Sequence, residues 1–470
     1  MDKTYKDFVR AQMRLNPCLY GLAEFMTKDR PKLQPDGIFS CLEYLKNNTR
    51  RLWTRVTPHD FVSTIRTAHQ SPDEVLGRVL FVQDPGPETI DCLGSAFDID
   101  PLFFATYIDT SFADLELRPA PPSIAIVPSR FSAKDAVHLH YQRILNLGDC
   151  ARISEEKLKL DSNVARSVKR IPLLGGANLA FVRSCCSVLK KPVNGRQWLC
   201  LVLLDSTTAD IIQFDGSTKE TRRYAQIPFQ GGFEDIMDPI SFSQFISTGA
   251  SIVWRPRSLT QAVIRYFAKD MPGFDPTDPS MLSLSYYPIK VTISEWMIYT
   301  LLLSRYVKHY EYRLYRLDVQ LRPDDLHELQ PWRRRSKQSL HKLRLMQSFV
   351  EHHISTELEK GPWTDVLHDI QHLSSQVAQW ASFLESLSSV ATTMIQLTDT
   401  RRSVQEADNV KRLTAIALIF VPLGFVASLF SMSETVAPWS DRFWLYFAVA
   451  VPLLLVVLVF SVYPLGRVQR

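Results

Sequence analysis

The sequence predicts an α+β domain with a long helical stalk, followed by two C-terminal transmembrane helices. Strand and helix patterns mix in the first 290 residues, an apolar heptad repeat follows, and two uncharged apolar runs come last. Each run exceeds the roughly 20 residues that a helix needs to cross a bilayer. We divide the chain into the α+β domain (1–290), a helical region with the stalk (291–412), a first transmembrane helix (413–433), an external loop (434–442), a second transmembrane helix (443–465) and a cytosolic tail (466–470).

The first domain combines helices and strands. Residues 1–120 have a mostly helical pattern, with a strand at Val79–Val82 and a helix from Glu88 to Phe97. Between 123 and 255 the pattern is that of strands, because short apolar runs are separated by turn signals. The pair Asn194-Gly195 between two such runs predicts a β-hairpin. The candidate strands are Ser123–Val127, Val137–Leu145, Asn178–Leu189, Gln197–Leu204 and Asp210–Phe214.

Ahead of the first transmembrane run, apolar residues recur at alternating spacings of four and three. This 3.5-residue period is typical of a coiled-coil helix that packs lengthwise on other helices. At 1.5 Å per residue, the repeat extends over about 50 Å. No helix breaker separates it from the apolar run, so we expect one continuous helix. The repeat consists of Val366, Ile370, Leu373, Val377, Trp380, Leu384, Leu387, Ala391, Met394 and Thr398.

The charges beside the two apolar runs predict their orientation. Basic residues precede the first run and follow the second, whereas the loop between them contains Arg442 against Glu434 and Asp441. Basic flanks face the cytoplasm, so both ends of the chain are expected there. Seven cysteines without a CxxC pair favour free thiols in a reducing compartment. The first residues form no apolar targeting core, which disfavours a mitochondrion but does not distinguish the plasma membrane from a vacuole. Of these membranes, the plasma membrane is the expected location.

Composition and motifs exclude several classes of function. The net charge is only +5 and no basic stripe alternates with aromatic residues, which excludes nucleic acid as an expected partner. The motifs GxxxxGK[ST], HExxH and GxSxG are absent, so we expect no enzyme activity, no catalytic residue and no cofactor. His368 and His372 stand one helical turn apart, but no further ligand completes a metal site and a solvated face is favoured. A surface pair is favoured for His138 and His140.

The C-terminal segment resembles a known family of membrane proteins. Val410–Phe430, with Pro422 inside it, is similar to the first transmembrane helix of the CorA family, and Arg442–Phe447 is similar to the start of the second. More loosely, Gly77–Phe104 resembles the N-terminal domain of fungal CorA-like proteins. The resemblance implies a CorA-like funnel, in which a homopentamer in the lipid bilayer transports divalent cations. Mg²⁺ is the expected ion.

The signature of that family is altered in this sequence. CorA proteins have Gly-Met-Asn at the outer end of the first transmembrane helix, where this chain has Ser431, Met432 and Ser433. The resemblance implies a ring of polar oxygens there that contacts the hydration shell of Mg²⁺, an ion that loses water reluctantly. A serine hydroxyl reaches less far than an asparagine amide. Two interpretations stay open: a divalent-cation channel of a fungal type, and a non-conducting scaffold or regulatory protein derived from CorA.

One face of the first transmembrane helix contains the candidate pore residues. They are apolar toward the cytoplasm and small or polar toward the outside, although small residues also permit close helix packing. Glu434 and Asp441 would attract cations only weakly, because Arg442 offsets them. Asp98 and Asp100 are candidate sensors of cytosolic cations, and turn chemistry explains them equally well. The candidate pore residues are Val410, Leu413, Ala417, Val421, Gly424, Ser428, Ser431, Met432 and Ser433.

Overall fold

The structure is a computed structural model of the chain, and it divides into two compact units. The first comprises Met1–Val319 and His327–Leu387, and the second comprises Gln320–Leu326 and Ser388–Arg470. Helix α11 (Gly361–Phe430) contributes residues to both. The residues that the structure describes are 4–27, 38–54, 57, 59–60, 62–63, 75–108, 134–147, 157–171, 178–193, 197–206, 211–215, 218–222, 241–248, 259–269, 273–315, 323–355, 360–432 and 442–462.

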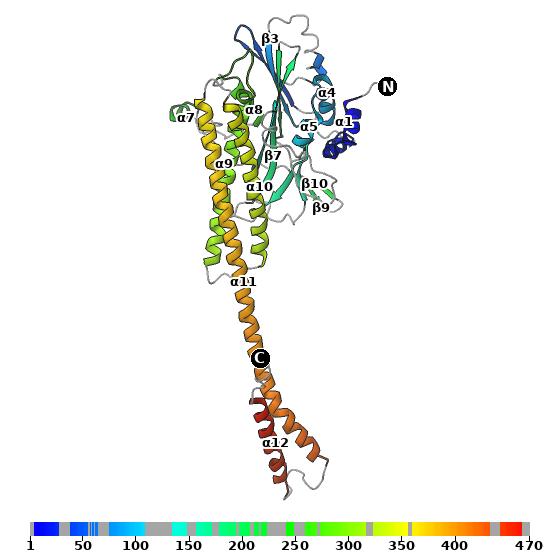
Figure 1. Cartoon of the computed structure of the whole chain (residues 1–470), viewed down its shortest axis with the longest axis vertical. Coiled ribbons are helices and arrows are strands. Elements are labelled where there is room, and N and C mark those ends of the chain that lie inside the picture. The colour runs from blue at the N-terminus through cyan, green and yellow to red at the C-terminus, as the bar shows by residue number, and fades with distance from the viewer. Residues whose placement is uncertain are drawn as a thin grey trace. The chain divides into compact units, whose positions relative to one another are not determined.

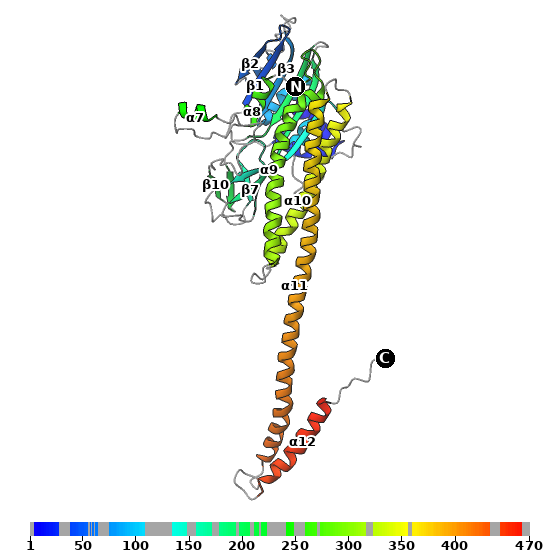
Figure 2. The ribbon, with the colours of Figure 1, turned by 90° about the vertical axis from the view of Figure 1, so that its left-hand side faces the viewer.

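A mixed sheet of ten described strands forms the centre of the first unit (Figures 1 and 2). Its order is β10-β9-β5-β6-β7-β8-β3-β1-β2, and β4 pairs with β7 outside this path. Among the described strands every pair is antiparallel except β3 with β8, which is parallel. The strands are β1 (Ile38–Leu45), β2 (Arg50–Thr54), β3 (Val75–Gln83), β4 (Ala136–Asn146), β5 (Lys157–Leu160), β6 (Ser167–Arg170), β7 (Leu179–Val193), β8 (Gln197–Leu204), β9 (Ile211–Asp215) and β10 (Thr218–Arg222).

The predicted hairpin is confirmed. Strands β7 and β8 pair antiparallel up to Val193 opposite Gln197, and β8 has the predicted bounds. Asn194 and Gly195 themselves lie outside the described residues, as does the candidate strand at Ser123–Val127. The other three candidate strands correspond to β4, β7 and β9. Apolar runs between turn signals are therefore reliable indicators of strands in this part of the chain.

The expectation of a mostly helical region up to residue 120 is wrong for β1, β2 and the full length of β3. Strands β1 and β2 form a hairpin, and Asn48 in its turn has φ 61°. Asparagine tolerates this left-handed backbone better than most residues. The Thr49 hydroxyl donates a hydrogen bond to Asn47 Oδ1 at 2.6 Å, which fixes the turn. The Asn47-Asn48 pair is the sequence signal for this hairpin.

Helices cover both faces of the sheet around β3, so the domain is of the α/β kind. Leu80 and Val82 of β3 belong to an apolar core with the N-terminal helices, which lie together on one side in Figure 1. Phe81 between them points to the other face and contacts Phe267 of α8 (Leu259–Phe267) at 5.3 Å. The N-terminal helices are α1 (Tyr5–Met13), the 3₁₀ helix η1 (Pro17–Leu19), α2 (Tyr20–Thr27), α4 (Pro87–Phe97) and α5 (Pro101–Ile108); a short helix, α7 (Phe242–Thr248), precedes α8.

Three long helices pack side by side in the first unit (Figures 1 and 2). They are α9 (Met281–Tyr315), α10 (Pro323–Ile354) and the first part of α11. Tyr306 of α9 contacts Trp332 of α10 at 4.6 Å between ring centroids, and Tyr286 of α9 contacts Trp363 of α11 at 5.0 Å. An ion pair of 2.6 Å joins Lys337 of α10 to Glu385 of α11. The predicted long helical region is confirmed.

The heptad repeat is buried as far as Ala391, with Trp380 half-buried. Beyond it, Met394 and Thr398 of the same repeat are exposed in the single chain. Helix α11 nevertheless continues without a break to Phe430, as predicted. The repeat therefore packs inside this chain over its first part, and further along it offers an uncovered apolar stripe.

The second unit pairs the end of α11 with α12 (Trp444–Val462). Val426 and Ala450 are buried between them, and the rings of Phe430 and Tyr446 meet edge-on with centroids 6.3 Å apart. Among the described residues, one helix, α11, is long and apolar enough to cross a membrane. The apolar stretch of α12, Trp444–Val459, is shorter, so the second transmembrane helix stays a prediction.

Close packing around one glycine fixes the position of β3. Gly77 faces the indole of Trp198 on the parallel neighbour β8, and a Cβ atom on Gly77 would overlap that ring. The indole cannot retreat easily, because its Nε1–H donates a 2.9 Å hydrogen bond to the Pro276 carbonyl. Its ring also contacts Tyr44 and Phe274, with centroids 5.5 and 6.1 Å away.

We expect Gly77→Ala to destabilise the first unit by about 1–3 kcal/mol, because the added methyl group overpacks a fixed site. Urea unfolding of the purified full chain, followed by tryptophan fluorescence, measures the loss. Gly361→Ala is the matched control, since a Cβ there meets no atom within 4 Å. Equal midpoints for Gly77→Ala and the control would contradict this packing.

Candidate functional site

The predicted pore residues lie along one helix in the second unit. Those from Val410 to Ser428 belong to α11, and Ser431 and Met432 form the turn that follows. All of these residues are exposed in the single chain, and around Gly424 an added Cβ would find nothing within 4 Å. Ser433 and the two loop acids, Glu434 and Asp441, lie outside the described residues. Their roles therefore stay predictions.

The candidate pore face points away from α12. Val426, which is 2% exposed, lies two residues before Ser428, and this spacing places it about 160° around the helix from Ser428. The Tyr446 hydroxyl of α12 approaches the Leu423 carbonyl at 3.5 Å on the same packed side. Phe420 and Phe425 are exposed on either flank of the small-residue face. The helix thus has a side covered by α12 and an opposite, uncovered side with small residues at its outer end.

The candidate sensing residues, Asp98 and Asp100, make hydrogen bonds that stabilise the turn between α4 and α5. Asp98 ends α4 in the left-handed conformation, with φ 47°, and its carbonyl accepts a 2.7 Å hydrogen bond from Lys191 Nζ. The Asp100 carboxylate accepts a 2.9 Å hydrogen bond from the Leu102 N–H at the start of α5. These contacts are the turn and cap chemistry that the sequence offered as the alternative. Cation sensing at this pair stays a prediction.

The histidines are distributed differently from expectation. His368 and His372 are exposed, and the described residues contain no group of three or more His, Cys, Asp or Glu that could hold a metal. The prediction of a surface pair at His138 and His140 is wrong, because both side chains are partly buried. His138 lies against α5 and β7, and His140 lines a cleft with residues of α9 and α10. The His138 ring contacts Phe103 of α5 at 5.1 Å, and its Nδ1 lies 2.7 Å from Ser187 Oγ. Burial lowers the pKa of His138 to about 3.

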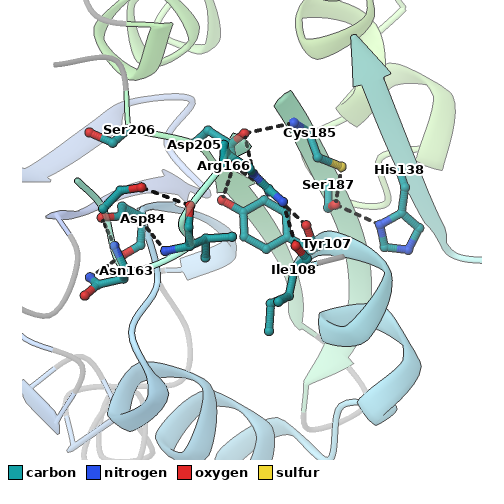
Figure 3. Close-up of polar contacts among 12 residues, drawn as sticks. Asp84, Tyr107, Ile108, His138, Asn163, Arg166, Cys185, Ser187, Asp205 and Ser206 are labelled. Carbon is teal, nitrogen blue, oxygen red and sulfur yellow. Dashed lines mark hydrogen bonds and ion pairs between the residues drawn. The ribbon is translucent and has the colours of Figure 1, made fainter. Parts of the chain in front are cut away.

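A buried ion pair that the sequence did not reveal lies at the end of β8 (Figure 3). The Arg166 guanidinium donates two hydrogen bonds, of 2.8 and 3.1 Å, to the Asp205 carboxylate. It also donates to the carbonyls of Tyr107 and Ile108 at the end of α5. Asp205 accepts further hydrogen bonds from the Tyr107 hydroxyl and the Cys185 N–H, at 2.9 and 3.0 Å. One ion pair thus ties β7, β8, α5 and the segment before β6 together.

A second buried acid holds the same segment to β3 (Figure 3). The Asp84 carboxylate accepts hydrogen bonds from the N–H groups of Asn163 and Val164, at 2.9 and 3.0 Å. The Asp84 N–H donates to the Leu204 carbonyl at 2.8 Å, which extends the parallel pairing of β3 with β8. Burial raises the pKa of Asp84, and this effect is larger than the opposite effect of the two hydrogen bonds. The network is a structural joint between strand ends.

Cys185, Ser187 and His138 form a short chain of polar contacts beside this joint (Figure 3). The Cys185 Sγ atom lies 3.5 Å from Ser187 Oγ, which in turn contacts His138. A nucleophilic cysteine needs a lowered thiol pKa, whereas burial raises the pKa of Cys185 to about 12. The low pKa of His138 likewise opposes an imidazolium partner. Cys185 is therefore a neutral thiol and His138 a neutral imidazole, as in a packed core.

A known family of proteins matches the C-terminal part of the chain. The family model of the CorA-like Mg2+ transporter protein matches residues 261–467. These residues are CorA-like. The CorA-like segment includes the three long helices, the candidate pore face and α12, and it covers less than half of the chain. The chain matches none of the curated proteins.

Two solved structures resemble the chain at low identity. The CorA magnesium transporter from Methanocaldococcus jannaschii is 11% identical with a TM-score of 0.36, and the alignment covers 92% of this chain and 99% of that one. The full-length CmaX protein is 13% identical with a TM-score of 0.40, and the alignment covers 91% of this chain and 98% of that one. The family model, rather than either structure, relates the CorA-like segment to transporters.

We expect Arg166→Met to destabilise the first unit by about 3–5 kcal/mol, because it leaves the Asp205 carboxylate buried without its cation. Replacing both partners, as Arg166→Met with Asp205→Leu, is expected to recover part of this loss. Urea midpoints of the full chain measure both effects. The control Lys337→Met breaks the exposed pair with Glu385 and is expected to leave the midpoint unchanged. A similar small effect for both methionine variants would contradict a joint at Arg166.

Stability is expected to fall as the pH drops below about 6.5. The unfolded chain binds a proton at His138 near pH 6.5, whereas the folded chain binds it only near pH 3, so protons favour unfolding between these values. Lys342 and Lys134 face the ring and add to this effect, while Glu295, whose pKa burial raises to about 7, acts in the opposite direction.

We expect His138→Asn to reduce the loss of unfolding free energy between pH 7.5 and 5 by up to about 2 kcal/mol. Thermal unfolding of the full chain at both pH values measures the difference. His372→Gln alters an exposed histidine and provides the control. An unchanged pH dependence in His138→Asn would show that His138 is not the responsible group.

Proposed function

We propose that this protein is a membrane channel that lets divalent cations, with Mg²⁺ as the expected ion, cross the bilayer. The observation that carries the proposal is the small-residue face of α11 turned away from α12. The match of residues 261–467 to the CorA-like Mg2+ transporter model supports the same kind of function. The long apolar helix supports a place in a membrane. Neither finding points to an enzyme.

The pore face requires further copies of the chain. One helix encloses no channel, and Val410, Leu413 and Val421 are all more than half exposed in the single chain. Association around these residues would cover them, with Phe420 and Phe425 packing between neighbouring helices. The uncovered part of the heptad repeat, from Met394 onward, would pack in the same assembly. We propose a homopentamer, as the resemblance implies.

The chemistry of the face suits a hydrated cation. Leu413 and Val421 would form apolar constrictions that close by losing water. Gly424, Ser428 and Ser431 would widen the path and offer hydroxyl oxygens, and Ser433 would complete the outer ring. Neutral oxygens can bind the waters of Mg²⁺ without removing them. Each 100 mV of membrane potential would favour entry of a divalent ion by about 4.6 kcal/mol, so no nucleotide is needed.

The flanking charges support an orientation with both ends in the cytosol. Arg401, Arg402, Lys411 and Arg412 lie on α11 just before its apolar part, and all four are exposed. The Arg402 guanidinium pairs with Glu406 at 3.2 Å. The other three basic residues outnumber the remaining acids nearby, Asp399 and Asp408. Basic residues are retained on the cytoplasmic side. We propose the plasma membrane as the location.

One observation favours a second candidate function. Ser431 and Ser433 replace the glycine and the asparagine of the family signature. The shorter hydroxyl would contact the hydration shell less closely, and a side chain at 431 would keep neighbouring backbones apart. A scaffold or regulatory protein with the same oligomeric architecture and no conductance would have these properties.

Mg²⁺ flux into liposomes containing the purified protein distinguishes the two functions. We expect flux in the wild type and a loss of at least about tenfold in Gly424→Leu, because five leucines would fill the wider part of the path with apolar side chains and exclude water from it. Ala448→Leu makes a comparable change at an exposed position of α12 and is expected to keep wild-type flux. Crosslinking of each preparation establishes that the oligomer is intact.

Intact oligomers without flux would contradict the channel and favour the scaffold. Flux that appears only when Ser431→Gly is combined with Ser433→Asn would identify a pore that the serines have closed. Equal losses in Gly424→Leu and Ala448→Leu would contradict the assignment of the pore face.

A further inference from the structure

A polar cleft lies in the first unit where the edge strand β4 and its neighbour β7 meet α9 and α10. Among the described strands β4 pairs with β7 alone. We name this cleft the β4 cleft. Its lining residues are His140, Tyr141, Gln142, Arg183, Ser184, Trp296, Gln338, Ser339 and Lys342.

The charged groups of the β4 cleft share one sign. Arg183 and Lys342 are cations, and no Asp or Glu is among the nine described lining residues. Burial lowers the pKa of His140 well below its usual value, so this ring adds no charge. Burial lowers the pKa of Lys342, and Arg183 lowers it further. Burial and the nearby Arg334 lower the pKa of Arg183 in the same way. The cleft therefore concentrates positive charge in a poorly solvated place.

A third nearby cation adds to this positive field. Burial lowers the pKa of Arg335 to about 10, and Arg183 contributes to the shift. Its guanidinium lies over the rings of Phe181 and Trp332, at 4.6 and 5.0 Å from their centroids. These aromatic faces hold Arg335 in place beside Arg183 without cancelling its charge.

The cleft also offers neutral hydrogen-bond donors. Ser184 is 1% exposed, and its hydroxyl has no hydrogen-bond partner in the described part of the chain, although it lines the cleft. A buried hydroxyl without a partner is costly and is normally satisfied by water or a ligand. The Gln338 amide accepts a 2.9 Å hydrogen bond from Arg183 and so fixes the direction of the guanidinium.

We propose that the β4 cleft binds a phosphate group, supplied either by inorganic phosphate or by a nucleotide. The planar guanidinium of Arg183 can bind two phosphate oxygens at once, and the Lys342 ammonium provides a compact second charge. Ser184 would donate a third hydrogen bond. The bound anion would link β4 and β7 to α9 and α10. This site is independent of ion conduction and lies outside the pore face.

Thermal unfolding of the detergent-purified full chain, without divalent cations, tests the site. Inorganic phosphate is expected to raise the unfolding temperature of the wild type in a saturable manner, beyond the effect of chloride at equal ionic strength, because a ligand of the folded state stabilises it. Lys342→Met is expected to weaken the response at least tenfold in phosphate concentration.

Two further variants keep the test decisive. Lys337→Met removes an exposed cation from the same helix and is expected to retain the full response. Ser184→Ala removes a single oxygen and, should Lys342→Met fail to fold, is expected to weaken the response several-fold. A response to ATP alone would identify a nucleotide as the source, and a response to phosphate identifies the free anion.

If neither inorganic phosphate nor ATP raises the unfolding temperature of the wild type more than chloride does, the proposal is overturned and water alone fills the β4 cleft. An unchanged response in both Lys342→Met and Ser184→Ala would also overturn it, by placing the phosphate elsewhere. Because no flux is measured, failure of this proposal leaves the channel proposal unaffected.

Discussion

The ion pair between Arg166 and Asp205 is the contact on which the arrangement of the first unit depends. Both side chains are almost completely buried, with 2% and 5% of their surface exposed. Two charges in such a place are stable only when each is fully hydrogen-bonded, and Arg166 satisfies this condition by reaching the end of α5 as well as Asp205. The helices on one face and strands from distant parts of the chain therefore share a single fixed point.

Helix α11 contains two kinds of surface that follow each other along one backbone. In the bundle Trp363 and Glu385 of α11 contact α9 and α10, and farther on the buried side of α11 meets α12. The change occurs where the apolar stripe becomes exposed, around Met394. No break in the helix separates the two parts, so a rotation of the bundle segment about its own axis would turn the candidate pore face as well.

Local patterns predicted the elements that depend on neighbouring residues. The β7–β8 hairpin follows from alternation and a turn signal, and the stalk follows from a repeat that its own partners bury. Contacts between distant residues left no such signal. Arg166 and Asp205 are 39 positions apart, and the packing that half-buries His138 comes from α5 and β7. The β1–β2 hairpin was missed because Asn47-Asn48 lacks the glycine that usually marks such a turn.

The candidate pore was predictable as a face of a helix, because periodicity decides which residues share a side. In the proposed oligomer, what that face encloses depends on other copies of the chain. A single sequence contains no pattern for the outer end of a helix where Ser431 and Ser433 replace the residues of the family signature. The β4 cleft was not predictable at all. Its basic residues come from β4, β7 and α10, and only the tertiary fold brings them together.

The buried thiols have a practical consequence for studying this protein. Six described cysteines are free, and Cys41, Cys185, Cys186 and Cys200 among them are buried, with raised thiol pKa values. Maleimide reagents attack exposed thiolates, so these four will stay unlabelled at neutral pH. Spin labels or fluorophores can therefore be attached at new cysteines along α11 once Cys18 and Cys92, which are partly exposed, and Cys150 have been replaced. The core cysteines can remain in place, and the motion of the apolar helix can be followed in an otherwise native fold.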